Sequence, residues 1–275
     1  MLNIRQLSQL LGISPQTIRK YEQHGIFEAE RSSANYRKFG RSAITTLMKC
    51  RKLMGMGFSI RQILQIASGT TYPQGQLMLR EQADALEKEI RLLMDKRRGV
   101  VHMHNIMKQI REKQGACVLG TAPAVYCCPV LKNTELLIGK DAAFLDKWNE
   151  YAFLRHDVKR IPAAVLMEGT DIHEYTGEYC VRVDDAERLG LDVSHAYRLE
   201  EHLCVTAYAV CPADNQPPIG KLFSFAADYI REHRLKIVMD LIIFLPFWPL
   251  PSSCDDHLLM AIYVEPPADE QAPPT

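Results

Sequence analysis

The sequence lacks the features that would place a protein in a membrane or outside the cell. Its N-terminus has no positively charged stretch followed by an apolar one, so we expect no secretory signal. Its most apolar run, residues 237–250, contains Asp240, Pro246 and Pro249 and is too short to span a bilayer. We therefore expect a cytoplasmic protein that has no membrane partner.

Closely spaced cysteine pairs are also missing. No two of the eight cysteines are separated by two intervening residues, which is the spacing of zinc knuckles and redox dithiols. The adjacent Cys127 and Cys128 are poorly placed for one disulfide. Most of the cysteines lie in apolar surroundings, so we expect reduced, buried thiols and predict neither a metal site nor a cofactor.

The chain of 275 residues also has no net charge, but its basic and acidic residues are unevenly distributed along the sequence. Residues 1–70 contain 11 Lys and Arg against 3 Asp and Glu, a net +8, whereas residues 115–275 contain 13 against 24, a net −11. A length of this size suits two domains. The basic first domain predicts a polyanionic partner, and the acidic second domain predicts that this partner does not touch it.

Residues 14–25 predict one short, well-delimited helix. Ser14 is a good N-cap, Pro15 suits the first helical position, and Gly25 can supply the left-handed residue that ends the helix. A first helix is predicted before it, starting at Asn3 and ending at Gly12. Two helices joined by a tight turn are typical of a helix-turn-helix, whose second helix enters the major groove of DNA.

The residues after Gly25 predict a β-ribbon, or wing. Two short apolar and basic segments flank a polar turn that contains Asn35, and two further helices are predicted to start at Ser42 and Ser59. Basic side chains of the wing are suited to phosphate contacts. The candidate DNA-binding residues are Ser14, Thr17, Arg19, Lys20, Tyr21, Tyr36, Arg37, Lys38 and Arg41.

The segments 17–22, 35–37 and 57–63 together resemble the MerR family of transcription regulators over about the first 70 residues. Two departures are Lys20, where the family often has an aromatic residue, and Asn35, where the wing usually turns on glycine. The resemblance implies a homodimer that bends and untwists a pseudo-palindromic promoter so that RNA polymerase can engage. Protein contacts then offset a DNA deformation that costs roughly 1–6 kcal/mol.

A long pairing helix is predicted next, because residues 76–113 contain no proline and only one glycine, Gly99. Residues at heptad spacing form a seam of Leu79, Ala83, Leu86, Ile90, Leu93, Arg97, Val100, His104 and Met107. This seam indicates a coiled-coil homodimer, antiparallel by the resemblance. Arg97 and His104 weaken it, either because they face the neighbouring subunit's DNA-binding domain or because the register changes near Gly99.

From residue 116 onwards, β-branched and aromatic runs replace helical periodicity. Strands are expected near 116–121, 124–131, 161–168, 177–184, 202–210, 235–245 and 257–264, with helices near 137–156 and 218–233. Strand, helix, strand, strand occurs twice, which indicates a duplicated α+β unit. The expected fold class is α+β: a winged helix-turn-helix domain (1–72), a dimerisation helix (75–114), a duplicated α/β effector-binding domain (115–265) and a disordered tail (266–275).

The order of these strands resembles the GyrI-like effector-binding domains of multidrug-sensing MerR regulators. That resemblance implies a bulky aromatic or cationic ligand, held by rings and by a buried carboxylate. Asp240 is the first candidate acid, since it lies in an apolar run where it shares a strand face with Ile242 and Phe244. Glu178 is the second, and the remaining candidates are Tyr126, Trp148, Tyr151, Tyr208, Phe244 and Trp248.

Two rival interpretations stay open. A thiol- or metal-responsive regulator would use Cys117, Cys127 and Cys128, just beyond the long helix, because thiolates are good ligands for soft metals. An enzyme is the weaker rival, because no catalytic constellation can be assembled from local motifs. The leading hypothesis is a ligand-responsive DNA-binding activator that is not an enzyme.

Overall fold

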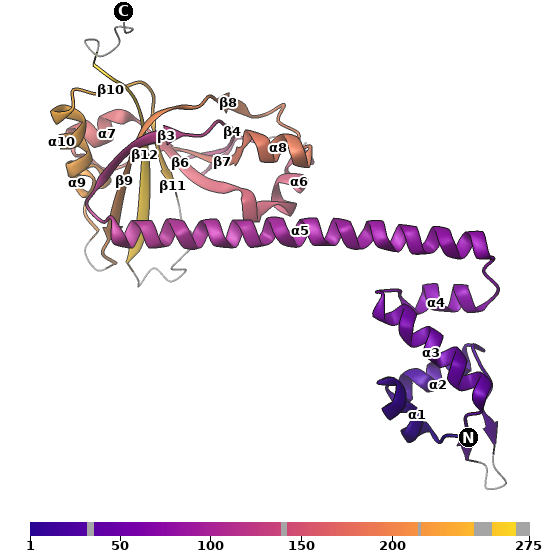
Figure 1. Cartoon of the computed structure of the whole chain (residues 1–275). Helices are drawn as coiled ribbons and strands as arrows, with labels where there is room; N and C mark the ends of the chain where they lie inside the picture. The colour runs from indigo at the N-terminus through magenta and orange to yellow at the C-terminus, as the bar shows by residue number, and fades with distance from the viewer. Residues whose placement is uncertain (32–35, 139–141, 214–215, 245–254, 268–275) are drawn as a thin grey trace, which may run out of the picture. The chain divides into compact units, whose positions relative to one another are not determined.

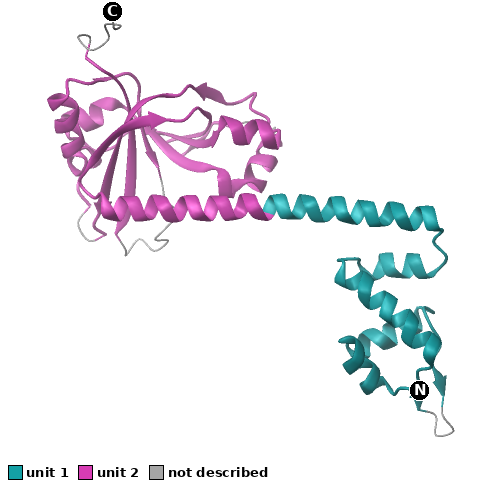
Figure 2. Ribbon diagram, in the orientation of Figure 1, with its two compact units in different colours: residues 1–92 teal, residues 93–275 magenta. Residues whose placement is uncertain are grey.

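The computed structural model describes residues 1–31, 36–138, 142–213, 216–244 and 255–267. The chain divides into two compact units, Met1–Leu92 and Leu93–Thr275 (Figure 2). Within the described residues, no helix combines the length and the apolar composition that a membrane span requires.

In the residues that the structure describes, the N-terminal unit contains four short helices and a two-stranded ribbon ahead of its long helix. They are α1 (Ile4–Leu11), α2 (Pro15–Gln23), β1 (Glu30–Arg31), β2 (Arg37–Lys38), α3 (Arg41–Gly55) and α4 (Ile60–Ala67). Their apolar faces enclose one core, in which Leu7, Ile18 and Leu47 are fully buried. This core holds the nine-residue α2, because a helix of that length is marginal on its own.

Helix starts in this unit follow the predicted caps, with one exception. The Asn3 side chain accepts from the Gln6 N–H, and the Ser59 side chain accepts from the Gln62 N–H, so both form capping boxes. The third helix was predicted to start at Ser42, but it is α3 and begins at Arg41 after Gly40 in extended conformation. The cap prediction for Ser42 is therefore wrong.

Helix α5 (Tyr72–Glu112) is the longest element, with 41 residues. Its residues 72–92 belong to the N-terminal unit and residues 93–112 belong to the C-terminal unit. The helix runs through Gly99 without interruption, so no break occurs there.

In the described part of the C-terminal unit, ten strands form one antiparallel sheet in the order β3-β9-β12-β11-β6-β7-β4-β5, with β10 on β12 and β8 on β4 (Figure 1). The strands are β3 (Cys117–Ala122), β4 (Val125–Lys132), β5 (Glu135–Leu136), β6 (His156–Ile161), β7 (Thr176–Arg182), β8 (Tyr197–Leu199), β9 (His202–Cys211), β10 (Lys236–Ile237), β11 (Leu241–Phe244) and β12 (Asp256–Glu265). The helices are α6 (Phe144–Glu150), the single-turn η1 (Ala152–Leu154), α7 (Ala163–Glu168), α8 (Val183–Leu189), α9 (Ile219–Leu222) and α10 (Ser224–Glu232).

The sheet has the order expected of a duplicated unit. Strands β4, β6 and β7 with helix α6 form one half, and strands β9, β11 and β12 with helix α10 form the other. In each half the third strand lies between the first and the second, and the two second strands, β6 and β11, pair at the centre. The α+β fold class predicted from the repeated pattern is confirmed.

Two predicted strands differ from the structure. The strand expected at 161–168 is helix α7, because Pro162 ends β6 and the helix then closes at Gly169 in left-handed conformation. The strand expected at 235–245 is divided into β10 and β11, and Asp240 lies in the connection between them. Short apolar runs fit a buried helix as well as a strand, which explains the first error.

Helices cover one face of this sheet and leave the other to α5. Side chains of α7, α9 and α10 pack on the β9–β12–β11 half, and side chains of α6 and α8 pack on the β4–β7 half. Helix α5 runs along the opposite face (Figure 1). There, Ile106 and Ile110 of α5 pack against Tyr208 and Leu259. The face towards α5 is where the cavity described below lies.

Candidate DNA-binding surface and ligand cavity

Helix α2 presents basic side chains from a well-anchored backbone. The Ser14 Oγ accepts from the Thr17 N–H at 3.1 Å, Pro15 occupies the first turn, and Gly25 has φ of +71° just after the helix. Arg19 and Lys20 are exposed, and neither has an ion-pair partner in the described part of the chain. These two cations can therefore contact phosphates without first breaking a bond.

The wing is tied to α2 by a salt bridge. Glu30 and Arg31 of β1 pair with Lys38 and Arg37 of β2. The Arg37 Nε donates to the Glu22 Oε2 at 2.8 Å, so part of its donor capacity is already used within the unit. Lys38 is half-buried, whereas Tyr36 and Arg41 are exposed; Asn35 lies outside the described residues.

Tyr21 is a core residue. Its side chain is fully buried, and within the described residues its hydroxyl has no hydrogen-bond partner. Burial, followed by the nearby Cys50 thiol, raises the pKa of Tyr21 above its ordinary value. A side chain enclosed in this way cannot reach a DNA backbone, so we leave Tyr21 out of the proposed DNA-contacting set.

A cavity of about 460 Å³ lies between α5 and the open face of the sheet. Its floor consists of alternate residues on neighbouring strands, such as Thr206 of β9, Ala261 of β12 and Ile242 of β11, which are paired across the sheet. His102, Asn105, Ile106 and Gln109 of α5 form a wall. The volume falls within the usual range for small-molecule sites.

The polar groups of the cavity are neutral or cationic. Among the residues described as lining it, none is Asp or Glu, whereas Arg182, His102 and His156 are present. Burial, followed by the proximity of His102, lowers the pKa of His156 to about 4, so His156 is neutral at neutral pH. Aromatic surface comes from Tyr208, Phe244 and Tyr263, and the Tyr208 hydroxyl donates to the Gln109 Oε1 at 3.0 Å.

The buried acid of this domain is Glu178, and its charge is already matched. Arg160 donates to both of its carboxylate oxygens, at 3.0 and 3.2 Å, and the Tyr197 hydroxyl lies 2.8 Å from each of them. Burial lowers the pKa of Arg160, but the hydrogen bonds and charge of Glu178 outweigh this effect and raise it above the ordinary value. The carboxylate is therefore fully compensated within the protein.

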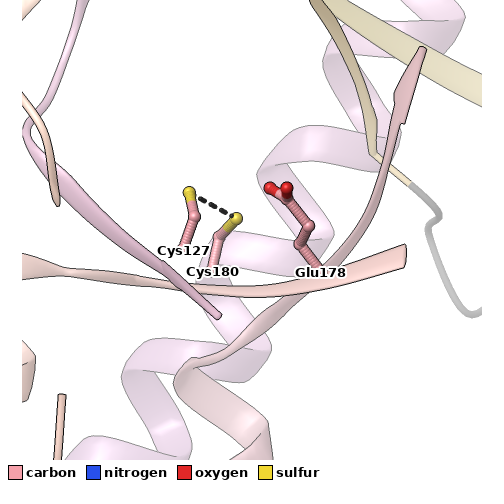
Figure 3. A group of neighbouring side chains, drawn as sticks. All are labelled: Cys127, Glu178 and Cys180. Carbon is pink, nitrogen blue, oxygen red and sulfur yellow. Dashed lines mark hydrogen bonds between the residues drawn. The ribbon is translucent and has the colours of Figure 1, made fainter. Parts of the chain in front are cut away.

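Two cysteines meet beside Glu178 (Figure 3). Cys127 of β4 and Cys180 of β7 occupy directly paired positions, and their Sγ atoms are 2.9 Å apart. The contact with Cys127, followed by burial, raises the pKa of Cys180 well above its ordinary value, so Cys180 is a neutral thiol at neutral pH. Both thiols are free, and these three residues could hold a metal ion.

Comparison with known proteins identifies the N-terminal unit. Residues 2–70 match the family model described as MerR HTH family regulatory protein. The HTH-type transcriptional regulator HmrR of Rhizobium leguminosarum bv. viciae is 30% identical to the chain over 111 residues, which cover 37% of this chain and 83% of that relative. The chain belongs to the MerR family.

Two further matches of this MerR-family chain cover different shares of it. Heavy metal-dependent transcription regulator 2 of Rhizobium meliloti is 36% identical over 66 residues, which cover 24% of this chain and 45% of that relative. A solved complex of EcmrR with DNA covers 96% of this chain and 100% of its own, at 12% identity and a TM-score of 0.35. That score is too low for a structural inference, so the resemblance of the C-terminal domain to GyrI-like domains stays a prediction.

The predicted ligand-binding residues of this MerR-family chain do not all lie at the cavity. Tyr208 and Phe244 line the cavity. Tyr126, Trp148 and Tyr151 lie in the core beneath the helix-covered face, where the Trp148 indole donates to the Asp192 carbonyl at 2.9 Å. Trp248 lies outside the described residues.

Asp240, the first candidate acid, does not lie in the buried environment that was predicted for it. Asp240 is exposed in a connection and does not line the cavity, so it is not the buried acid that a ligand site requires. The second choice, Glu178, is only 2% exposed, but it is occupied by Arg160 and Tyr197.

Sequence reasoning missed several lining residues. Tyr263 lies two residues from Ala261 on β12, and strand alternation could have placed both on the cavity face. His102 and His156 are 54 residues apart in the sequence and meet only in the fold, so no local pattern indicated them. The predicted cysteine set is also divided, because Cys127 and Cys128 are neighbours on one strand and point to opposite faces.

Proposed function

We propose that this chain is a ligand-responsive transcription regulator of the MerR family that binds a pseudo-palindromic promoter as a homodimer. An effector in the cavity would bias the chain towards a state that distorts the promoter and lets RNA polymerase engage. One observation carries this proposal: a wall of the cavity is formed by α5, and the same helix begins in the DNA-binding unit. A ligand that changes how α5 packs on the sheet therefore acts on an element that both units share.

DNA binding is supported by the charge and exposure of α2 and the wing. Arg19, Lys20 and Arg41 are exposed in a segment of net charge +8, and Lys38 lies on the neighbouring wing strand. We assign these side chains to phosphate contacts and assign Thr17, at the start of α2, to the groove. Tyr36, which is 73% exposed at the wing, would contact the backbone.

A homodimer is supported by the apolar row on α5. Leu79, Leu86, Ile90, Leu93 and Val100 follow the heptad seam, and they are between 39% and 68% exposed in the single chain. A row of this kind on a 41-residue helix needs a partner, and a second copy offers the matching row. Two subunits would also supply the two recognition helices that two half-sites require.

The lining favours a neutral or anionic aromatic effector over a cationic one. Aromatic rings and apolar strand residues supply stacking surface, as expected. A cation would find Arg182 and no acid among the described lining residues, and the nearby Glu178 is already paired with Arg160. The aromatic part of the predicted ligand class is therefore retained in this proposal, and the cationic part is not.

A second candidate function is a thiol- or metal-responsive regulator on the same DNA-binding scaffold. The specific observation that favours it is the contact between Cys127 and Cys180 beside Glu178, since Cys180 also lines the cavity. A Rhizobium meliloti relative is named as heavy metal-dependent, which makes metal ions a natural effector class to test. The predicted set of Cys117, Cys127 and Cys128 does not converge, so the candidate now depends on Cys180.

The proposal is tested with the chain's own upstream DNA and a panel of aromatic compounds of different charge. Neutral or anionic members should raise the unfolding temperature and change the footprint, by mass action on the state that they bind. Gly120→Phe should abolish both effects, because a Cβ at Gly120 meets nothing within 4 Å and the ring can fill the cavity.

Leu119→Phe is the matched control, because Leu119 is the next residue of β3 and does not line the cavity. A chain that protects no DNA site would refute the DNA-binding half of the proposal. Stabilisation by cations alone would refute the effector class.

A further inference from the structure

We propose that Cys127 and Cys180 form a binding site for a thiophilic divalent metal ion of the zinc and cadmium class, with Glu178 as a third donor at its edge. Its three side chains project from one face of the sheet of the C-terminal unit, from the neighbouring strands β4 and β7 (Figure 3). It is distinct from the cysteines that follow the long helix directly, such as Cys117 on β3.

The positions of the donors support a shared ion. The two Sγ atoms are 2.9 Å apart, and a carboxylate oxygen of Glu178 completes a set whose members all lie within 4.8 Å of one another. Metal–sulfur bonds of about 2.3 Å in tetrahedral geometry place two thiolates about 3.8 Å apart. Small rotations of two side chains on fixed, paired strands would open that space.

Charge balance selects a divalent ion. Each thiol would lose one proton to solvent on binding, so two thiolates and one divalent cation make a neutral unit. Glu178 adds no uncompensated charge, because Arg160 already balances it through two hydrogen bonds. A monovalent ion would leave one net negative charge in a region where all three donors are buried, and burying an unbalanced charge is costly.

An entry path exists through the cavity. Cys180 lines the cavity wall, whereas Cys127, directly opposite it, is fully buried. An ion would therefore bind the sulfur of Cys180 first and then that of Cys127. Arg182, two residues along β7, lines the same cavity and repels every cation, so only an ion that gains strong bonds to sulfur would be retained.

This inference deepens the second candidate function and rests on it only for a regulatory role, because metal binding can be measured without DNA. The full-length chain, reduced and handled without oxygen, is titrated with Cd²⁺, and the ultraviolet thiolate-to-cadmium absorption is recorded. We expect one tightly bound ion per chain and the release of two protons for each ion.

Cys127→Ser and Cys180→Ser should each lower the affinity for this ion by at least 100-fold. Cys128→Ser is the matched control, because Cys128 is equally buried on the same strand but faces the opposite side. It should retain wild-type affinity. In case a variant folds poorly, the ¹¹³Cd resonance of the wild-type chain should itself report two sulfur ligands.

Two outcomes would overturn the site: no stoichiometric uptake by the reduced chain, or an equal loss of affinity in Cys128→Ser. Metal binding that depends on both cysteines but leaves DNA affinity unchanged would support the site and remove the second candidate function.

Discussion

Gly99 marks a close approach between α5 and the rest of the C-terminal unit, and its replacement tests that contact. A Cβ at this position would lie 2.1 Å from the Phe153 carbonyl oxygen and 3.0 Å from the carbonyl carbon. Both atoms belong to the backbone of η1, so a side-chain rotation cannot relieve the overlap. Gly99→Ala must therefore push α5 and η1 apart.

Two effects of opposite sign determine how Gly99→Ala changes the free energy of unfolding. In a helix interior, alanine is more favourable than glycine by about 1 kcal/mol. Overpacking in a close contact costs typically about 1–3 kcal/mol, and a contact as short as this one belongs at the upper end. We expect the free energy of unfolding of the C-terminal unit to fall by about 1–2 kcal/mol.

Gly75 provides the matched control on the same helix, because a Cβ there would meet nothing within 4 Å. Gly75→Ala should therefore show the propensity gain alone and stabilise α5 by about 0.5–1 kcal/mol. The two identical substitutions are predicted to have opposite signs. Helix propensity alone would give them the same sign.

Urea unfolding followed by tryptophan fluorescence measures the effect on the C-terminal unit, since both tryptophans, Trp148 and Trp248, belong to residues 93–275. Far-ultraviolet circular dichroism, which reports on helices of both units, measures Gly75→Ala. A lower midpoint with an unchanged slope indicates lost stability. An unchanged or higher midpoint for Gly99→Ala would refute the close contact between α5 and η1.

Four further predictions concern single side chains. The pKa of His156 is lowered from 6.5 to about 4, so the unfolded state binds a proton at a higher pH than the folded state, and stability should fall by up to about 3 kcal/mol as the pH drops from 6.5 to 4. In His156→Phe, the urea midpoint should depend less on pH across this range. Tyr21→Phe removes a buried hydroxyl that has no hydrogen-bond partner in the described residues, so it should raise the free energy of unfolding by up to about 1 kcal/mol and leave DNA affinity unchanged. Weaker DNA binding by this variant in a titration would mean that Tyr21 does contact DNA. Glu178→Gln leaves the Arg160 guanidinium without its counter-charge and should destabilise the C-terminal unit by about 3 kcal/mol in urea unfolding. A change below about 1 kcal/mol would mean that water solvates the guanidinium in place of the carboxylate. Arg19→Ala should reduce the slope of log affinity against log salt by about 0.9 if Arg19 contacts one phosphate, and an unchanged slope would exclude that contact.

The N-terminal unit could be predicted because its signals are local. Asn3 with Gln6, Ser14 with Pro15, and Ser59 with Gln62 each act within four residues, and the structure forms each of these caps. Burial on short helices follows the same local periodicity, and Ile18 is buried on α2. Tyr21 shows the limit, because a tyrosine on a recognition helix fits a packing role and a contact role equally well in sequence.

The ligand cavity could not be predicted in the same way, because its residues meet across distant strands. The repeated order of strands and helices was visible, but the pairing of β6 with β11 that places Arg160 beside Ile242 was not. Sequence alone likewise cannot show that Cys127 faces Cys180, 53 residues away, instead of its neighbour Cys128. Sequence identifies aromatic residues only by type, and the fold is what separates Tyr208 in the cavity from Trp148 in the core.

Under the proposed function, the ion pair of Glu178 beside the cavity would disfavour cationic ligands. A cationic ligand would gain a counter-charge there only by displacing Arg160, which holds the carboxylate through two hydrogen bonds. Breaking a buried pair of this kind costs about 3–5 kcal/mol, which corresponds to a loss in affinity of roughly 100-fold or more. A neutral aromatic ligand avoids that cost, and an anionic one gains from Arg182 at the cavity wall. Arg160→Met should leave the buried carboxylate of Glu178 without its counter-charge and lower the stability of the C-terminal unit. Because a bound cation would then restore that counter-charge, cationic aromatic compounds should stabilise this variant more than their neutral counterparts do, as measured by thermal shift.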